Sequence, residues 1–184
     1  FINAEGRMPV IFSEEEVAES LEGWKRVLAE HPGVFKEEWL EEIGRHINDL
    51  NQKYYSEQSR FNHGDFHYEN IMQDADGNIK VVDWQNYGTG HISGDISFFL
   101  SRLSADGYGI DAKEVIDLYC ECTKKRGCRV QAIEIEIQMC LANINTTFRY
   151  WHVYLPGSTT ERVRSIYEKM VEDWKILSKP IETR

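Results

Sequence analysis

One short stretch, residues 70–83, interrupts a chain whose apolar pattern is otherwise helical. The apolar runs 70–73 and 79–83 are both too short for helices, and the loop between them contains an Asp-Gly step. An Asp-Gly step between two such runs is typical of a β-hairpin. Because the strands of a hairpin are antiparallel, the start of the first lies beside the end of the second. The sequence therefore predicts that Asn70 and Asp83 lie close together.

The remainder of the chain has apolar residues three and four positions apart, which is the spacing of one buried helix face. Ser13 and Glu16 form a capping-box pattern that predicts the start of a first helix, which ends near Gly33. We expect further helices over residues 36–58, from Asp95 onward, and over about 111–126, 130–154 and 160–177. Residues 84–94 contain three glycines and are expected to form a loop. The predicted fold class is mainly α with a small β-hairpin, in a single domain over residues 1–184.

The composition excludes some classes of function. With 31 Asp and Glu against 21 Lys and Arg, the net charge of −10 argues against a nucleic-acid binder, which usually has a basic face. No apolar run approaches the roughly 20 residues that a membrane-spanning helix needs, and no signal peptide is visible. The four cysteines, Cys120, Cys122, Cys128 and Cys140, include no Cys-x-x-Cys pair for zinc and are expected to be free, buried thiols. Such thiols indicate a reducing compartment, so we expect a cytoplasmic protein.

The residues just before the hairpin, His63-Gly64-Asp65, suggest phosphoryl transfer from a metal-bound nucleotide. That reaction needs a carboxylate to receive the proton of the acceptor hydroxyl, and hard oxygen ligands for magnesium. Asp65 can provide the first, and the amide of Asn70 with the carboxylate of Asp83 can provide the second. Gly64 permits a tight backbone path before Asp65. His63 is expected to fix the loop by hydrogen bonding rather than to act as a base.

Two other functions are consistent with parts of this pattern. His63, Asp65 and His67 alternate along one segment, and alternate residues of an extended segment share a face. This trio could hold a transition metal in a hydrolase, although such a site needs a further strong ligand for which the sequence has no motif. The other alternative is a non-catalytic pseudokinase that acts as a binding module. The intact Asp65, Asn70 and Asp83 do not favour it.

The letters HGDFHYEN and VVDWQ resemble the catalytic motifs of the aminoglycoside phosphotransferase and choline kinase-like superfamily, which includes an ecdysteroid kinase-like branch. The resemblance covers about residues 61–103. It implies that Asp65 is the catalytic residue, that Asn70 and Asp83 bind magnesium and the nucleotide, and that His67 lines the catalytic loop. The segment Gly-Asp-Ile-Ser-Phe-Phe-Leu further implies that Asp95 begins a helix and supports that loop.

The resemblance also implies a fold, cofactors and partners. It implies the helical C-terminal catalytic lobe of a protein-kinase-like α+β fold, with ATP and Mg²⁺ as cofactors and a small-molecule hydroxyl as acceptor. Members of the superfamily have an N-terminal lobe with a phosphate-binding lysine. None of Lys25, Lys36 and Lys80 lies in a sequence pattern of that kind. We therefore expect the nucleotide-binding lobe of the same parent protein to be missing from this chain.

The acceptor stays open between an aminoglycoside, a choline-like amine and another alcohol. Tyr150, Trp151 and Tyr154 cluster near the end of one predicted helix. Aromatic faces can hold an ammonium group by cation–π attraction. The same spacing is also typical of a helix face that packs in the core.

Overall fold

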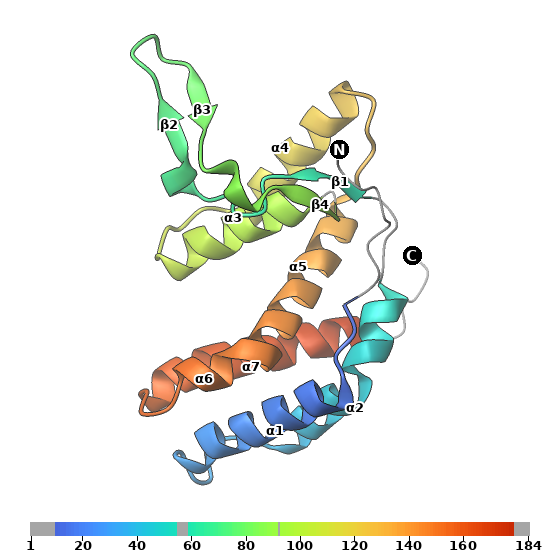
Figure 1. Ribbon diagram of the computed structural model, residues 1–184, viewed down its shortest axis with the longest axis vertical. Coiled ribbons are helices and arrows are strands. Elements are labelled where there is room, and N and C mark those ends of the chain that lie inside the picture. The colour runs from blue at the N-terminus through green and yellow to red at the C-terminus, as the bar shows by residue number, and fades with distance from the viewer. Residues whose placement is uncertain (1–9, 55–58, 92, 179–184) are drawn as a thin grey trace. The chain divides into compact units, whose positions relative to one another are not determined.

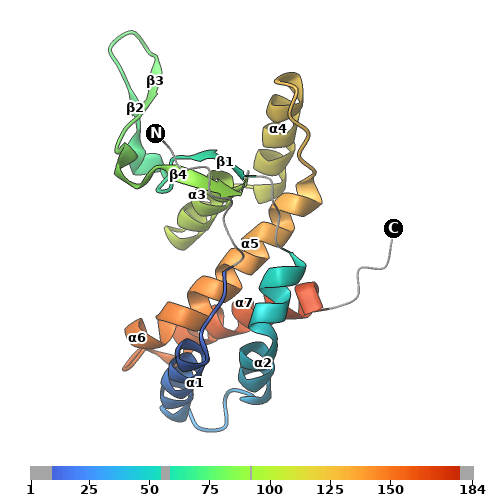
Figure 2. The same ribbon diagram turned by 45° about the vertical axis from the view of Figure 1, so that its right-hand side comes forward.

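The computed structural model describes residues 10–54, 59–91 and 93–178, which form two compact units (Figures 1 and 2). One unit is made mainly of residues 56–139, and the other of residues 9–55 and 140–184. The helices are α1 (Glu14–Ala29), α2 (Glu38–Lys53), α3 (Gly94–Ala105), α4 (Ala112–Lys125), α5 (Ala132–Thr146), α6 (His152–Tyr154) and α7 (Thr160–Ser178). The strands are β1 (Ser59–Asn62), β2 (Ile71–Gln73), β3 (Ile79–Val81) and β4 (Gly88–His91). The predicted fold class, mainly α with a small β-hairpin, is confirmed.

The predicted hairpin is formed by β2 and β3, which pair antiparallel with Ile71 opposite Val81 (Figure 1). Its turn is closed by the Asp74 N–H, which donates to the Asn78 carbonyl at 3.0 Å. Gly77 has a φ of +84°, the left-handed conformation that closes a three-residue hairpin turn and that the Asp-Gly step predicted. The strands are shorter than predicted, because the chain leaves the extended conformation at both ends of the hairpin.

The prediction of a loop over residues 84–94 was wrong. The segment contains a 3₁₀ turn at Trp84–Asn86 and then strand β4, which pairs antiparallel with β1 to form a second two-stranded sheet. The register sets Asn62 opposite Gly88 and Phe61 opposite Thr89. Gly-Thr-Gly-His has low intrinsic strand preference, so pairing with a distant segment of the chain determines its conformation.

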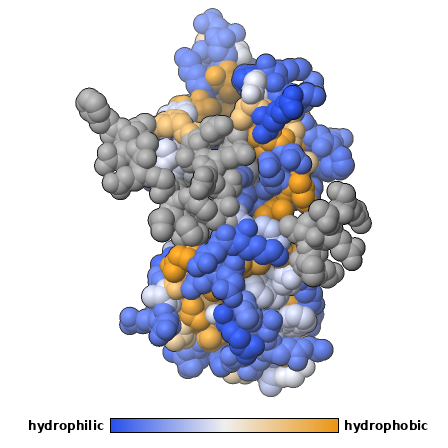
Figure 3. Space-filling model, turned by 90° about the vertical axis from the view of Figure 1, so that its right-hand side faces the viewer, coloured by the Kyte–Doolittle hydropathy of each residue, from blue (hydrophilic) through white to orange (hydrophobic). Residues whose placement is uncertain are grey.

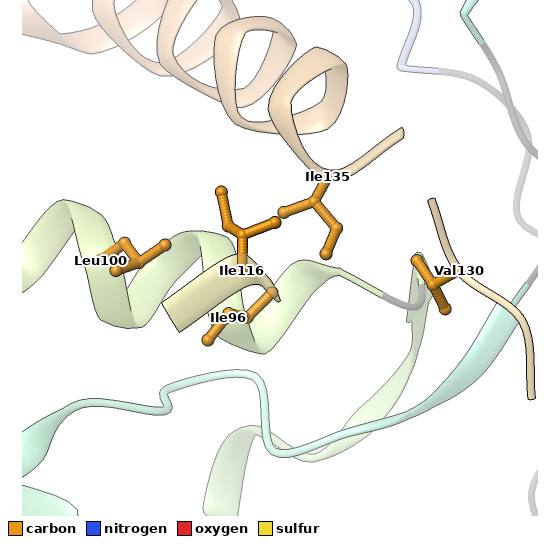
Figure 4. Packing of buried hydrophobic residues seen from close by; sticks show 5 residues of the cluster. All are labelled: Ile96, Leu100, Ile116, Val130 and Ile135. Carbon is orange, nitrogen blue, oxygen red and sulfur yellow. The ribbon is translucent and has the colours of Figure 1, made fainter. Parts of the chain in front are cut away.

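The core of the unit 56–139 lies between α3, α4 and the first half of α5 (Figure 4). Each helix turns one apolar face inward, as the spacing of three and four residues predicted. The start of α3 is thereby fixed by packing, which matters because Asp95 lies in its first turn. The buried members of this cluster are Ile96, Leu100, Ile116, Val130 and Ile135.

The second unit packs α1, α2 and α7 with the turn Thr147–Trp151 that follows α5 and with α6. The capping box is confirmed: the Glu16 N–H donates to Ser13 Oγ at 3.1 Å, and the Ser13 N–H donates to Glu16 Oε2 at 2.8 Å. Helix α2 begins two residues later than predicted. Residues 55–58 of its predicted last turn, and residues 1–9 of the lead-in, lie outside the described residues.

The predicted long helix 130–154 is helical but not uniform. Helix α5 passes into a π-helical turn at Thr147–Trp151 before α6. The fully buried indole N–H of Trp24 donates to the carbonyls of Thr147 and Phe148, at 3.2 Å and 3.1 Å. A π-turn changes the hydrogen-bonding of its carbonyls, and this indole supplies a donor where water cannot reach.

Three further observations concern membrane-spanning helices, the surface and the cysteines. Across residues 10–54, 59–91 and 93–178, no helix is both long enough and apolar enough to span a membrane. The face in Figure 3 is mainly hydrophilic, with smaller hydrophobic patches. The four cysteines all lie in described positions and form no disulfide, as predicted, but each is partly rather than fully buried.

Candidate functional site

The predicted site residues lie on the loop 63–70, which connects β1 to β2, at Asp83 just after β3, and at Asp95 in the first turn of α3. All of them belong to the unit 56–139. The side chain of Asp65 is 30% exposed, and Asp83 is exposed. His63 and Asn70, by contrast, are only 2% and 8% exposed. His63 and Asn70 therefore anchor the loop in the interior, whereas solvent and small molecules can reach the carboxylate of Asp65.

Asp95 holds the start of this loop through the backbone. Its Oδ2 accepts from the His63 N–H at 2.8 Å, and its Oδ1 accepts from the Gly64 N–H at 3.0 Å. Hydrogen bonds to a carboxylate are stronger than those to a neutral acceptor. Asp95 thus ties the first turn of α3 to the two residues that precede Asp65.

The ring of His63 connects the loop to the hairpin. A carbonyl can only accept, so the 2.8 Å contact between His63 Nε2 and the Val82 carbonyl makes Nε2 the donor. The other ring nitrogen, Nδ1, accepts from the Asp65 N–H at 3.3 Å. Both nitrogens are therefore used by backbone groups, which matches a supporting role and leaves neither to act as a base.

Both the backbone conformation and the neighbouring atoms at position 64 require a residue without a side chain. The φ of +84° at Gly64 is left-handed, a conformation that residues with a Cβ rarely adopt. A Cβ at this position would also lie 2.1 Å from the carbonyl oxygen of Asn86. The chain therefore passes too close to the 3₁₀ turn after Asp83 for any side chain to fit without movement.

Asn70 lies at the end of a short 3₁₀ turn, with its side-chain nitrogen directed into the loop. Nδ2 donates to the Asp65 carbonyl at 2.9 Å and lies 3.2 Å from Nε2 of His67. Within the described ranges, Oδ1 of Asn70 makes no hydrogen bond. An amide oxygen of this kind is a suitable ligand for a hard cation such as Mg²⁺.

Asp83 has an unusual backbone conformation next to Asn70. The Val82 N–H donates to the Asn70 carbonyl at 2.9 Å, so the chain at Asp83 runs beside Asn70 as the hairpin predicted. Asp83 has φ 62° and ψ 57°, and it is the one non-glycine residue with positive φ in the described part of the chain. Such strain is often found at functional positions.

The trio proposed for a hydrolase does not have the arrangement of a metal site. Both ring nitrogens of His63 contact backbone groups, so His63 cannot also bind a metal. Nε2 of His67 lies 3.8 Å from Asp65 Oδ1, and its Nδ1 lies 3.5 Å from Glu69 Oε2. No group of three or more His, Cys, Asp or Glu residues suited to a metal ion occurs among the positions that the structure describes.

An acidic and aromatic rim adjoins the loop, and it was not predicted from the sequence. The Tyr68 hydroxyl donates to Asp106 Oδ2 at 3.0 Å, and this bond raises the pKa of Tyr68. The rings of Tyr68 and Tyr108 meet edge to face at 5.4 Å. Arg102 lies between Glu69 and Asp106, at 3.5 Å and 3.7 Å. Tyr68 and Glu69 lie inside the motif, but their partners come from the last turn of α3 and the residues just after it, which no local pattern identifies.

A cavity of about 500 Å³ lies on the same unit and is mostly apolar. None of Asp65, Asn70 and Asp83 lines it. Burial raises the pKa of the Tyr119 hydroxyl, which is part of its wall. The lining of the cavity comes from β1, the loop, the hairpin, α3, α4 and the residues that follow α4, so sequence spacing could not reveal the cavity. The lining residues are Phe61, Asn62, His63, Phe66, Val81, Trp84, Asp95, Ile96, Tyr119, Thr123, Arg126 and Cys128.

The other candidate residues of the sequence do not belong to the loop. Tyr150 and Tyr154 are exposed and belong to the other compact unit, so a position in the core is wrong for both. Each of the three lysines considered as phosphate ligands has an acidic partner in its own unit: Lys25 pairs with Glu41, Lys36 with Glu38 and Lys80 with Asp74.

Comparison with known proteins gives one family. The model of the phosphotransferase enzyme family matches residues 7–128, which is more than half of the 184 residues. This match confirms the resemblance found in the motifs. A search of curated proteins gave no match. The mostly helical chain with its small antiparallel strand pairs is consistent with a kinase-like α+β fold.

Proposed function

The chain belongs to the phosphotransferase enzyme family, and from this membership we propose that it carries the catalytic residues of an ATP-dependent small-molecule kinase. The reaction would move the γ-phosphoryl group of ATP to a hydroxyl group of the acceptor. The observation that carries the proposal is the loop 63–70, in which the ring N–H of His63 and one N–H of the Asn70 amide donate to backbone carbonyls while the carboxylate of Asp65 stays accessible.

In this proposal Asp65 orients the acceptor hydroxyl and receives its proton. Phosphoryl transfer requires little covalent assistance, so the position of this carboxylate matters more than its basicity. Its backbone carbonyl accepts from Asn70 and its N–H donates to His63. Contacts at both ends of the residue restrict where the carboxylate can lie.

Asn70 and Asp83 are the proposed magnesium ligands. The amide oxygen of Asn70, which accepts no hydrogen bond from a described residue, and the exposed carboxylate of Asp83 are hard oxygen donors at the open end of the hairpin, just before β2 and just after β3, which fits the preference of this ion. When bound, the magnesium ion neutralises the charge that develops on the phosphate oxygens. The same two residues would thereby hold the nucleotide, while His63, Gly64 and Asp95 support the loop.

We further propose that the acceptor carries a positive charge, as an aminoglycoside or a choline-like amine does. The loop that contains Asp65 adjoins the acidic and aromatic rim of Tyr68, Glu69, Arg102, Asp106 and Tyr108. In this rim two carboxylates share one guanidinium group. Carboxylates and aromatic faces both attract ammonium groups. Because one guanidinium group neutralises only one of the two carboxylates, a net negative charge remains that a neutral sugar or lipophilic alcohol would not pair with.

The test is a screen for acceptor-dependent ATP consumption with magnesium, using the longest natural form of the protein that contains this chain. The panel contains aminoglycosides, choline-like amines, sugars and lipophilic alcohols. We expect consumption with one of the two cationic classes, and its loss in Asp65→Asn. The control Asp76→Asn changes an exposed carboxylate in the hairpin turn and should keep the activity. Failure of the wild type to bind magnesium-ATP at all would refute the kinase proposal.

A further inference from the structure

We propose that His67 is a positioning residue, which orients the Asn70 amide with its oxygen toward the metal and leaves Asp65 without a hydrogen-bond donor. This inference rests on the proposed function of Asn70 and Asp65. It assigns a role to a partly buried imidazole that the motif chemistry does not use. Three polar and two aromatic contacts of the His67 ring support it, together with the partners of Asn70.

The orientation of the Asn70 amide follows from its first partner. The Asp65 carbonyl can only accept, so the atom 2.9 Å from it must be the amide nitrogen. That nitrogen has a second hydrogen, and His67 Nε2 lies 3.2 Å away. If Nε2 accepts this hydrogen, both donors of Asn70 are satisfied on one side. The oxygen is then left on the other side of the amide.

The role of Nε2 as acceptor requires the proton of the neutral imidazole to be on Nδ1. Nδ1 is buried and makes no hydrogen bond to any described residue. Its nearest acidic group is the Glu69 carboxylate, at 3.5 Å, which lies beside Arg102. Asp65 lies at a similar distance from Nε2, so the tautomer is decided by the Asn70 amide nitrogen, which can only donate to Nε2 and so leaves the proton on Nδ1.

The same tautomer determines what Asp65 contacts. Nε2 lies 3.8 Å from Asp65 Oδ1, and without a proton it cannot donate to that carboxylate. The opposite tautomer would direct an N–H toward both Asp65 and the Asn70 amide nitrogen, which has no lone pair to accept it. With its proton on Nε2, His67 would therefore both misorient the Asn70 amide and donate to Asp65, the proposed base.

The His67 ring is well placed to hold this arrangement. Its side chain is only 13% exposed. The rings of Tyr68 and Phe98 contact it edge to face, both at 6.3 Å between centroids. A ring packed on two sides keeps its nitrogens in fixed positions.

The functional test compares His67→Gln, whose side-chain oxygen can accept near the position of Nε2, with His67→Leu, which has no acceptor. The variants are made in the longest natural form of the protein that contains this chain, and their affinity for the probe Mn²⁺·ATP is measured by electron paramagnetic resonance. We expect His67→Leu to weaken binding by roughly tenfold, as is common for residues that orient metal ligands. His67→Gln should recover most of this loss. Equal losses in the two variants would overturn the proposal.

A double-mutant cycle shows whether His67 acts through Asn70. In an Asn70→Ala background the effect of His67→Leu on Mn²⁺·ATP affinity should disappear, because the amide to be oriented is absent. A purely structural role would leave the effect of His67→Leu unchanged in that background, and this result would also overturn the proposal.

Nitrogen NMR of the chain decides the tautomer without any activity or ligand. The ¹⁵N shifts of the His67 ring should identify Nδ1 as protonated and Nε2 as an acceptor. Protonation at Nε2 would overturn the proposal whatever the enzyme does. If the wild type fails to bind Mn²⁺·ATP, the kinase proposal fails, and the NMR result still supports or overturns the orientation of Asn70 by His67.

Discussion

Two glycines with the same φ provide a controlled test of how closely the catalytic loop packs. Gly64 and Gly77 both have a φ of +84°. Replacing either with alanine places a side chain in the left-handed region, which costs roughly 1–2 kcal/mol. The surroundings differ, since a Cβ at Gly77 would lie 3.7 Å from the flexible end of Gln73, an ordinary contact.

At Gly64 the new Cβ would lie 2.1 Å from the Asn86 carbonyl oxygen, whereas ordinary contacts begin at 3.4 Å. The loop and the turn at Asn86 must therefore separate by about 1.3 Å, the difference of these two distances. Overpacking of this kind typically costs a further 1–3 kcal/mol or so. We expect Gly64→Ala to lower the free energy of unfolding by about 2–5 kcal/mol, and Gly77→Ala by only about 1–2 kcal/mol.

Urea denaturation of the two variants and the wild type measures this difference, provided that the slope of the transition is unchanged. Gly64→Ala should also reduce turnover, because Asp65 is the next residue, whereas Gly77→Ala should not. Equal destabilisation, to within about 0.5 kcal/mol, would show that the close approach to Asn86 has no energetic consequence and would refute the reasoning.

Three further predictions concern the supports of the two units. Asp95→Ala removes the acceptor of two backbone N–H groups and should reduce the hydrogen-exchange protection of the His63 amide by roughly tenfold or more, as NMR can measure. Trp24→Phe leaves carbonyls of the π-turn without their buried donor and should lower the urea-unfolding free energy by about 1–3 kcal/mol. Burial lowers the pKa of His152, so the unfolded chain binds a proton more readily than the folded chain. The free energy of unfolding should therefore fall as the pH drops below about 6.5, and it should fall less steeply in His152→Gln. Denaturation curves recorded across that pH measure both slopes.

The parts of the fold that were predictable from the sequence are those set by neighbouring residues. The Asp-Gly step determined the hairpin turn, and the capping box determined the start of α1. Strand β4 was missed because its two glycines have little strand preference, and its partner β1 lies on the far side of the hairpin in the sequence. The π-turn after α5 was missed because its carbonyls are satisfied by Trp24, from a distant helix.

The candidate site divides in the same way. The motif spacing indicated Asp65, Asn70 and Asp83, and the hairpin explains why the last two are neighbours. The rim around Asp106 and the tautomer of His67 depend on contacts between side chains, which spacing does not encode. The roles of these residues stay predictions until the variants are measured.

The measurement that tests the central claim most directly pairs nucleotide affinity with turnover in one variant, Asp65→Asn. If Asp65 receives the acceptor proton while Asn70 and Asp83 hold the metal, this variant should lose turnover and bind magnesium-ATP as the wild type does. Retained turnover in a folded Asp65→Asn protein would contradict the assignment of the catalytic carboxylate.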